Sequence, residues 1–360
     1  MKQEYIISND PNTSENFPDL VLTKKGELIC VFMECRHHGC REKTRLNIIK
    51  SKDKGRTWGE KIPFTPLADY PNGVYDCARI TRLPDDSLII ICNYEILKGD
   101  KVVSEIHAWY SYDDGETWTE PRVLPFVGVN PDKYRILSNG RHVVGLHRRD
   151  DPEMPKRWTQ YMYYSDDEGK TWNEVTIADD KRYSLCEVCI LEVKPGTLVA
   201  FMREDTLSGI TCMKAFSYDY GTTWEGVYES NLGDAHRPLA DFYEDGQIFC
   251  TYRFVQGGGR RYERDGLKWL NGPSQNLFGA FFDVETALEK DRRKNFSVIY
   301  PISYDRNRIN ADTGYSGWVR FDDGSFYVVN YLVDDNYCKG QIRGYSFDIT
   351  DVFYDEPESK

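Results

Sequence analysis

The segment Ser111-Tyr-Asp113-Asp-Gly115-Glu-Thr117-Trp118 decides the fold, because the chain contains it in four versions. The other three are Ser51-Lys-Asp53-Lys-Gly55-Arg-Thr57-Trp58, Ser165-Asp-Asp167-Glu-Gly169-Lys-Thr171-Trp172 and Ser217-Tyr-Asp219-Tyr-Gly221-Thr-Thr223-Trp224. The common form is S-x-D-x-G-x-T-W, and successive copies are about 50 to 60 residues apart, an interval typical of one four-stranded blade of a β-propeller. The repeat therefore predicts a propeller.

Each copy has the residues of a tight turn between strands. The aspartate is expected to accept local backbone N–H groups, the glycine to supply a positive φ, and the tryptophan to pack beneath the turn. Alternating, strand-like segments come before the turns, as in Arg45-Leu-Asn-Ile-Ile-Lys50 and Ile106-His-Ala-Trp-Tyr110. Strand and turn together predict an all-β chain.

These repeats resemble the Asp boxes of the sialidase superfamily, and the resemblance extends over nearly the whole chain. It implies a six-bladed β-propeller in which the boxes are structural and lie away from the site. Four boxed blades extend to about residue 230, and two less regular blades are expected over residues 236–295 and 296–350. The early strand over residues 4–7 is expected to pair with the last blade and close the ring. We predict one propeller domain over residues 1–350 and a short tail over residues 351–360.

Composition narrows the classes of partner. The formal net charge of −12 argues against nucleic acid, and basic clusters are short and adjoin acidic residues. The N-terminus lacks the apolar stretch of a secretory signal and no membrane span is expected, so the chain as written is expected to be cytoplasmic, or secreted if a signal was removed. The 25 tyrosines and 8 tryptophans suit both strands and sugar-binding clefts. A carbohydrate is therefore the expected partner, and no cofactor is expected.

The closest agreement with the sialidase pattern joins Glu187 to Arg203 across a strand pair. In that family a glutamate precedes such a pair, and an arginine at its end belongs to a triad that binds the sugar carboxylate. Asp312-Thr-Gly-Tyr315-Ser316 resembles the segment that carries the family's tyrosine nucleophile, which as a neutral phenol does not repel an anionic sugar. The position expected for its activating glutamate reads Asn330-Tyr331. Glu187 would replace that base if it approached Tyr315 across the channel.

The first blade departs from the family. The segment Asn16-Phe17-Pro18-Asp19 has no arginine where sialidases have the first member of their triad. Glu34-Cys35-Arg36 resembles the E-x-R that follows in those enzymes, and Arg36 is a predicted substrate-binding residue. Where an acid aspartate is expected, the chain has His37, His38 and Glu42, and any of these is a candidate general acid. Neighbouring strand residues point in opposite directions, so no metal site is expected there.

Further polar residues lie beside expected innermost strands. Asp76 is a candidate catalytic residue. The candidate substrate-binding residues are Arg79, His147, Arg148, Arg203, His236, Arg237, Arg253 and Asp312, and Arg237 or Arg253 is expected to replace the missing triad arginine.

These residues predict a sialidase-like glycoside hydrolase that removes a terminal acidic sugar. Two alternatives remain open. One is a non-catalytic propeller that binds carbohydrate or protein, and the other is a sialidase-fold enzyme with another mechanism, such as elimination or histidine-dependent hydrolysis.

Overall fold

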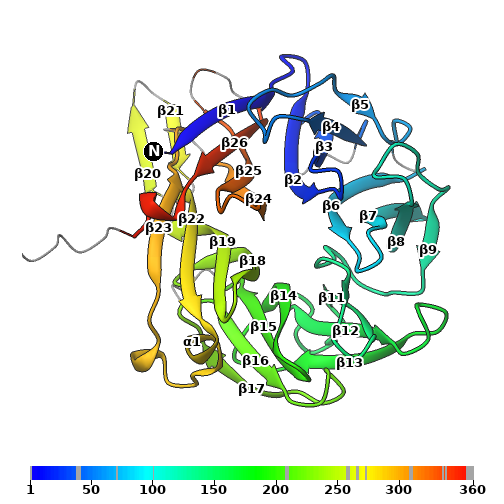
Figure 1. The fold of residues 1–360 in the computed structure, drawn as a ribbon, viewed down its shortest axis with the longest axis vertical. Coiled ribbons are helices and arrows are strands. Elements are labelled where there is room, and N and C mark those ends of the chain that lie inside the picture. Colours follow the sequence, from blue (N-terminus) through cyan, green and yellow to red (C-terminus); the bar gives the residue numbers. More distant parts are fainter. Residues whose placement is uncertain are drawn as a thin grey trace, which may run out of the picture.

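The chain folds into six four-stranded antiparallel sheets arranged around one axis (Figure 1). The structure, a computed structural model, describes residues 2–353 apart from residues 38–41, 70–71, 100, 207–210, 257–259, 265–266, 272–273, 308–310, 335 and 337–338. The prediction of a six-bladed propeller is confirmed. In blades 1 to 5 the first strand lies nearest the axis and later strands lie progressively further out, as Figure 1 shows for β2, β6, β14 and β18.

The strands of the first four blades follow one another in chain order. Blade 1 contains β2 (Ser14–Leu22), β3 (Leu28–Cys35), β4 (Arg45–Ser51) and β5 (Ile62–Pro63). Blade 2 contains β6 (Val74–Arg82), β7 (Leu88–Lys98), β8 (Lys101–Ser111) and β9 (Arg122–Leu124). Blade 3 contains β10 (Arg135–Ile136), β11 (His142–Arg148), β12 (Thr159–Ser165) and β13 (Asn173–Ala178). Blade 4 contains β14 (Leu185–Lys194), β15 (Thr197–Glu204), β16 (Met213–Ser217) and β17 (Glu225–Glu229).

The last two blades lack Asp boxes and are less regular. Blade 5 contains β18 (Ala235–Glu244), β19 (Gln247–Gln256), β22 (Ser274–Asp283) and β23 (Val298–Ser303), with a ribbon of β20 (Arg260–Arg264) and β21 (Leu267–Asn271) inserted after β19. The short helices α1 (Val284–Leu288) and η1 (Arg292–Lys294) connect β22 to β23. The predicted boundary at residues 295/296 is wrong, because β23 pairs with β22 and belongs to blade 5.

Blade 6 closes the ring with strands from both ends of the chain. It contains β24 (Thr313–Arg320), β25 (Phe326–Leu332), β26 (Gln341–Phe347) and, outermost, β1 (Gln3–Ser8), and η2 (Ile349–Asp351) follows it. The antiparallel pairing of β1 with β26 confirms the predicted closure. In this way β1 supplies the fourth strand of blade 6.

The Asp boxes form the predicted turns after the third strand of blades 1 to 4. In the second box, Asp113 accepts hydrogen bonds from the Thr117 backbone N–H at 2.9 Å and the Thr117 hydroxyl at 2.6 Å, while the Gly115 N–H donates to Ser111 Oγ at 2.8 Å. The same bonds recur in the other three boxes. These bonds satisfy the polar groups of the turn locally, so each box is a self-contained structural unit.

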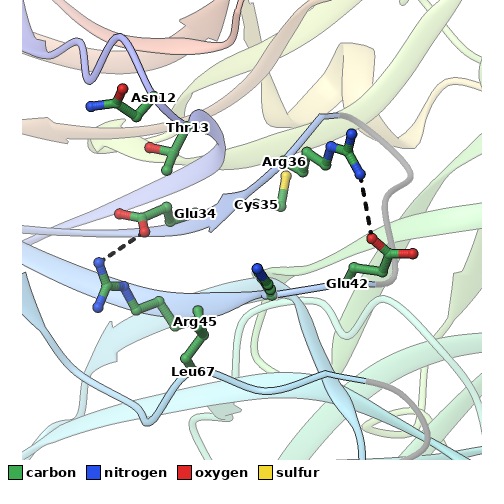
Figure 2. A pocket seen from close by; sticks show the side chains of 9 residues that line it. Asn12, Thr13, Glu34, Cys35, Arg36, Glu42, Arg45 and Leu67 are labelled. Atoms are coloured by element: carbon green, nitrogen blue, oxygen red, sulfur yellow. Dashed lines mark hydrogen bonds and ion pairs between the residues drawn. The ribbon is translucent and has the colours of Figure 1, made fainter.

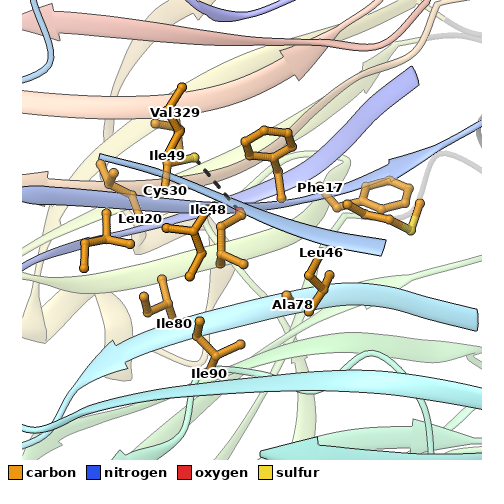
Figure 3. Close-up of a cluster of buried hydrophobic side chains, with 14 of the residues drawn as sticks. Phe17, Leu20, Cys30, Leu46, Ile48, Ile49, Ala78, Ile80, Ile90 and Val329 are labelled. Carbon is orange, nitrogen blue, oxygen red and sulfur yellow. Dashed lines mark hydrogen bonds between the residues drawn. The ribbon is translucent and has the colours of Figure 1, made fainter. Parts of the chain in front are cut away.

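Apolar side chains fill the spaces between neighbouring blades. Figure 3 shows one such cluster, in which Phe17, Leu20 and Cys30 of blade 1 pack against Ile80 of blade 2 and Val329 of blade 6. Packing of this kind fixes how each blade sits against the next, and so it fixes the positions of side chains that meet at the axis.

A bulge near the start of the innermost strand recurs around the ring. The register shifts at this point in β2, β6, β14, β18 and β24. One residue of each bulge has a positive φ: Phe17, Cys77, Glu187, Arg237 and Gly314. Bulges bend a strand and redirect its side chains. Because the strands begin on the face opposite the Asp boxes, the bulges define the face on which a site is built.

Candidate functional site

Glu187, Tyr315 and Arg203 meet at the axis although they come from different strands. Glu187 is the bulged residue of β14 with φ 45°, Arg203 lies near the end of the neighbouring β15, and Tyr315 lies in the bulge of β24. Gly314 has φ +106°, and a Cβ there would lie 2.7 Å from Arg253 Cβ. Only glycine therefore lets β24 approach Arg253 closely enough to place Tyr315.

The three side chains form one hydrogen-bonded group. The Tyr315 hydroxyl donates to Glu187 Oε1. Arg203 Nη1 donates to Glu187 Oε2 at 2.9 Å and to the Tyr315 hydroxyl oxygen at 3.1 Å. Glu187 is 3% exposed and Tyr315 is 7% exposed. Charge-assisted bonds in such a dry environment are strong, so the group is held in one geometry.

The protonation states of this pair follow from its neighbours. Burial alone would raise the pKa of the Glu187 carboxyl, but the Arg203 and Arg237 guanidiniums lower that pKa well below its ordinary value. Burial and the Glu187 charge raise the pKa of the Tyr315 phenol far above its ordinary value. The carboxylate is therefore ionised and the phenol keeps its proton, which it directs at Glu187. A base and a hydroxyl in this relation can generate a nucleophile.

A second arginine lies against the same tyrosine. The Arg253 guanidinium carbon is 4.2 Å from the Tyr315 ring centroid, a cation–π contact. Arg253 also donates to the Tyr331 hydroxyl, which donates to Asp312 Oδ1 at 2.6 Å. Asp312 thus orients Arg253 through Tyr331. The structure brings the predicted residues Glu187, Tyr315, Arg203, Arg253 and Asp312 into one cluster.

Phe17 occupies the part of the first blade where the sialidase resemblance leads one to expect an arginine. Its ring lies 5.3 Å from that of Tyr315 and 5.1 Å from that of Tyr331, centroid to centroid. The first blade therefore contributes an apolar surface to the cluster instead of a positive charge.

Two buried histidines contact the cluster as neutral groups. His147 Nδ1 accepts a hydrogen bond from the Glu187 backbone N–H at 3.1 Å, which supports the strained bulge and places the imidazole proton on Nε2. Burial lowers the pKa of His147 to about 3. Burial and the Arg203 charge lower the pKa of His236 to about 2. Both imidazoles are therefore uncharged at neutral pH.

Three predicted substrate-binding residues form internal contacts. Arg237 donates to the backbone carbonyls of Asn130 and Pro131 at 3.1 and 3.0 Å, so it crosses from blade 5 to blade 3. Arg79 donates to the Ser316 carbonyl at 3.0 Å and is buried in the channel. Arg148 makes two hydrogen bonds with Glu174 of β13, at the outer edge of blade 3. The predicted roles of all three in substrate binding stay predictions.

Trp158 and Asp205 border the cluster and were not among the predicted residues. Asp205 accepts a hydrogen bond from Arg203 Nη2 and another, at 3.2 Å, from the Trp158 indole N–H. Trp158 is half-buried, packs edge-on against His147, and has the Arg149 guanidinium 3.9 Å from its ring centroid. The sequence offers little to identify Trp158, which is a single aromatic residue in the polar segment between β11 and β12.

Of the predicted first-blade residues, Arg36 and Glu42 line a pocket of about 360 Å³ (Figure 2). Arg36 is exposed and pairs with Glu42 at 3.6 Å. Glu34 is committed to Arg45 at 2.8 Å and Lys61 at 2.9 Å, so its carboxylate has a structural role. His37 is exposed beside the pocket, and His38 lies outside the described residues. Glu42 and His37 remain the described candidates for a general acid.

Asp76 begins the bulge of β6 and is 8% exposed. Its role as a catalytic residue stays a prediction. Among the residues that the structure describes, no group of three His, Cys, Asp or Glu side chains is placed to hold a metal ion. The cysteines described there are free and buried. Within the same part of the chain, no helix has the length and apolar character needed to cross a bilayer.

Fold and bulge geometry together define a six-bladed propeller of the sialidase-like superfamily. The chain belongs to the BNR repeat-like domain family, whose model matches residues 76–328. It is 25% identical over 246 residues to a sialidase of Paraclostridium sordellii, covering 59% of this chain and 57% of that protein. It is also 28% identical over 128 residues to an anhydrosialidase of Macrobdella decora, covering 32% of this chain and 16% of that protein. The matched region thus spans little more than half the length of the first relative and about one sixth of the second.

Solved structures show the same fold. A protein of unknown function from Dyadobacter fermentans superposes with a TM-score of 0.74 at 20% identity, covering 96% of this chain and 97% of that one. The intramolecular trans-sialidase from Ruminococcus gnavus, in complex with oseltamivir carboxylate, gives a TM-score of 0.69 at 14% identity, with coverage of 98% and 99%. The NanB sialidase from Streptococcus pneumoniae gives 0.66 at 13% identity, with coverage of 97% and 70%. At these identities the similarity shows the fold alone.

Proposed function

We propose that this protein is a glycoside hydrolase that removes a terminal acidic sugar with Tyr315 as nucleophile and Glu187 as its base. The observation that carries the proposal is the hydrogen bond from the Tyr315 hydroxyl to an ionised, buried Glu187, between two arginines. The names of the two sialidase relatives support the substrate class.

The proposed reaction proceeds by double displacement. The Tyr315 oxygen attacks the anomeric carbon while its proton moves to Glu187, and the glycosidic C–O bond breaks as the leaving oxygen takes a proton from an acid on blade 1. Water then cleaves the tyrosyl–sugar bond and restores the phenol. A neutral phenol approaches an anionic sugar without charge repulsion. Arg253 and Arg203 would hold the sugar carboxylate, because a guanidinium matches a carboxylate in shape and charge.

Phe17 favours a second candidate, a propeller that binds carbohydrate without cleaving it. It leaves the cluster with no first-blade arginine, which in the family pattern completes the carboxylate site. A binding module would keep Arg203, Arg253 and the aromatic surface and would need no acid on blade 1.

Turnover of 4-methylumbelliferyl glycosides of sialic acid, uronic acids and neutral sugars tests the proposal. We expect release from the sialoside or a uronide, and a loss of about 10²- to 10⁴-fold in kcat/KM for Tyr315→Phe and for Glu187→Gln. Tyr252→Phe is the matched control, because Tyr252 is also a buried tyrosine but lies outside the cluster.

Turnover that survives in Tyr315→Phe would exclude the tyrosine mechanism and leave the histidine-dependent or eliminating alternatives. If no glycoside is cleaved while calorimetry detects binding of the free acidic sugar, the protein is a binding module.

A further inference from the structure

A second pocket lies between blades 1 and 2, and none of Glu187, Arg203 and Tyr315 lines it. It has a volume of about 620 Å³ and is bordered by β4 and β5 on one side and by β8 and the second Asp box on the other. We call it the inter-blade pocket; its aromatic lining is Phe64, Tyr75, Trp109 and Trp118. Its size is within the range of about 300–1,000 Å³ that small-ligand sites occupy.

The tryptophans of this pocket differ from the others in their hydrogen bonding. Buried indole N–H groups usually have a partner. Of the tryptophans whose side chains the structure describes, most donate to a protein oxygen: Trp58, Trp158, Trp172, Trp224 and Trp318. Trp109 and Trp118 have no such partner within the described part of the chain, and both line the inter-blade pocket. Their N–H groups are available to whatever fills it.

Trp118 differs from the tryptophans of other Asp boxes in the hydrogen bonding of its indole N–H. Trp172 and Trp224 occupy the same position in their boxes as Trp118, and each donates at 3.1 Å to the carbonyl of the glycine three residues earlier. Trp118 does not make that bond, although its ring packs edge-on against Phe64 at 5.3 Å just as the Trp172 ring packs edge-on against Phe126 at 4.7 Å. Trp118 therefore packs beside its box glycine as Trp172 does, and it differs in that its indole N–H has no protein acceptor among the described residues.

The next boundary shows how such a space is normally closed. Between blades 2 and 3, Phe126 packs on Tyr163 and Trp172 as Phe64 packs on Trp109 and Trp118. There the Tyr163 hydroxyl accepts from the Val127 N–H at 3.0 Å and donates to Glu174, which seals the boundary. Between blades 1 and 2, Trp109 occupies the position of Tyr163, and its indole makes neither of these hydrogen bonds among the described residues.

The charged groups at the rim limit the ligand. Lys50 pairs with Glu116 at 3.0 Å, and Glu120 is a further exposed carboxylate. The rim is therefore net negative and disfavours an anionic ligand. Aromatic side chains, indole donors and carboxylate acceptors suit the apolar faces and hydroxyl groups of a neutral sugar. We propose that the inter-blade pocket is a second carbohydrate site, which binds a neutral oligosaccharide and is independent of the axial cluster.

The test uses the full-length protein with Tyr315→Phe, so that no probe is consumed, and follows the tryptophan indole N–H signals by ¹⁵N NMR. The probes are cellotetraose, maltotetraose, xylotetraose and chitotetraose at millimolar concentration, with sialic acid and a proline decapeptide as comparisons. We expect at least one tetrasaccharide to shift the Trp109 and Trp118 signals in a saturable way and to leave Trp172 and Trp224 unchanged.

Trp118→Phe keeps an aromatic ring against Phe64 but deletes the donor, and it should weaken Kd by about two- to tenfold, as expected for one neutral hydrogen bond. Trp224→Phe, which makes the same replacement in another box, should leave Kd unchanged. If no tetrasaccharide shifts the two signals, or if only sialic acid or the peptide does, the proposal is wrong. None of these outcomes depends on whether the axial cluster cleaves a glycoside.

Discussion

Replacing Arg203 by methionine tests whether the axial cluster is held together by charge. Arg203 Nη1 lies 2.9 Å from Glu187 Oε2, and Glu187 is 3% exposed, so the substitution leaves a carboxylate buried without its direct partner. Breaking a buried ion pair in this way costs about 3–5 kcal/mol. We expect a value near the lower limit at pH 7, because Arg237 still acts on the Glu187 charge.

The pH dependence of this loss has a defined sign. In the wild type the pKa of Glu187 is below its ordinary value, so its contribution to stability is present above that ordinary value and disappears only in stronger acid. Without Arg203, we expect burial to outweigh the remaining effects of Arg237 and the Tyr315 hydrogen bond, and so to raise the pKa of Glu187 above the unfolded value. The folded state then binds more protons than the unfolded state, and the penalty grows as pH rises. The destabilisation should therefore be larger at pH 7 than at pH 5.

Urea denaturation followed by circular dichroism measures both quantities. Adding Glu187→Gln to Arg203→Met should recover part of the loss and remove its pH dependence. Arg182→Met, at an exposed arginine that pairs with Asp180, should leave stability nearly unchanged. One contrary result is a fall of less than about 1 kcal/mol in the free energy of unfolding for Arg203→Met, and the other is a failure of Glu187→Gln to restore any of it. Either result would contradict the inference that the Glu187 carboxylate is stabilised by Arg203.

Two further predictions concern stability and the separation of fold from site. His147 and His236 have pKa values of about 3 and about 2, so between about pH 4 and 6 the unfolded chain binds protons that the folded chain does not. Each histidine should make the free energy of unfolding rise by about 1.4 kcal/mol per pH unit in this range. His147→Gln or His236→Gln should each remove one such increment from the slope measured by urea titration. An unaltered slope would contradict the assignment of neutral imidazoles. Asp113→Ala removes the acceptor of an Asp box and should lower Tm in calorimetry without changing the turnover of any glycoside that the wild type cleaves, whereas a change in turnover would show that the box communicates with the axial cluster.

The fold could be predicted from the sequence because its main signal is local and repeated. Each Asp box satisfies its own hydrogen bonds within eight residues, so its form is visible in the sequence without knowledge of the rest of the chain. Blades 5 and 6 have no box, and the ribbon of β20 and β21 lengthens blade 5. The predicted boundary between those blades therefore came too early and excluded β23.

The geometry of the site could be predicted only in part. The sequence suggested Glu187 as the base for Tyr315 only on the condition that the two approach across the channel, because their hydrogen bond joins residues 128 positions apart and depends on the closure of the ring. The bulges that aim them have no common residue type, since their positive-φ positions are Phe17, Cys77, Glu187, Arg237 and Gly314. Arg237 has the chemistry of a carboxylate ligand, yet it bonds to backbone carbonyls of blade 3, a contact that no local pattern reveals.

Mass spectrometry of a trapped intermediate tests whether Tyr315 attacks the sugar. Retaining glycosidases pass through a covalent glycosyl-enzyme. A fluorinated acidic sugar with a good leaving group, matched to whichever glycoside the protein cleaves, slows the second step and allows that adduct to accumulate. We expect an adduct of one sugar on the peptide that contains Tyr315, and no adduct in Tyr315→Phe. An adduct on another residue, or none while the parent glycoside is hydrolysed, would contradict the tyrosine mechanism.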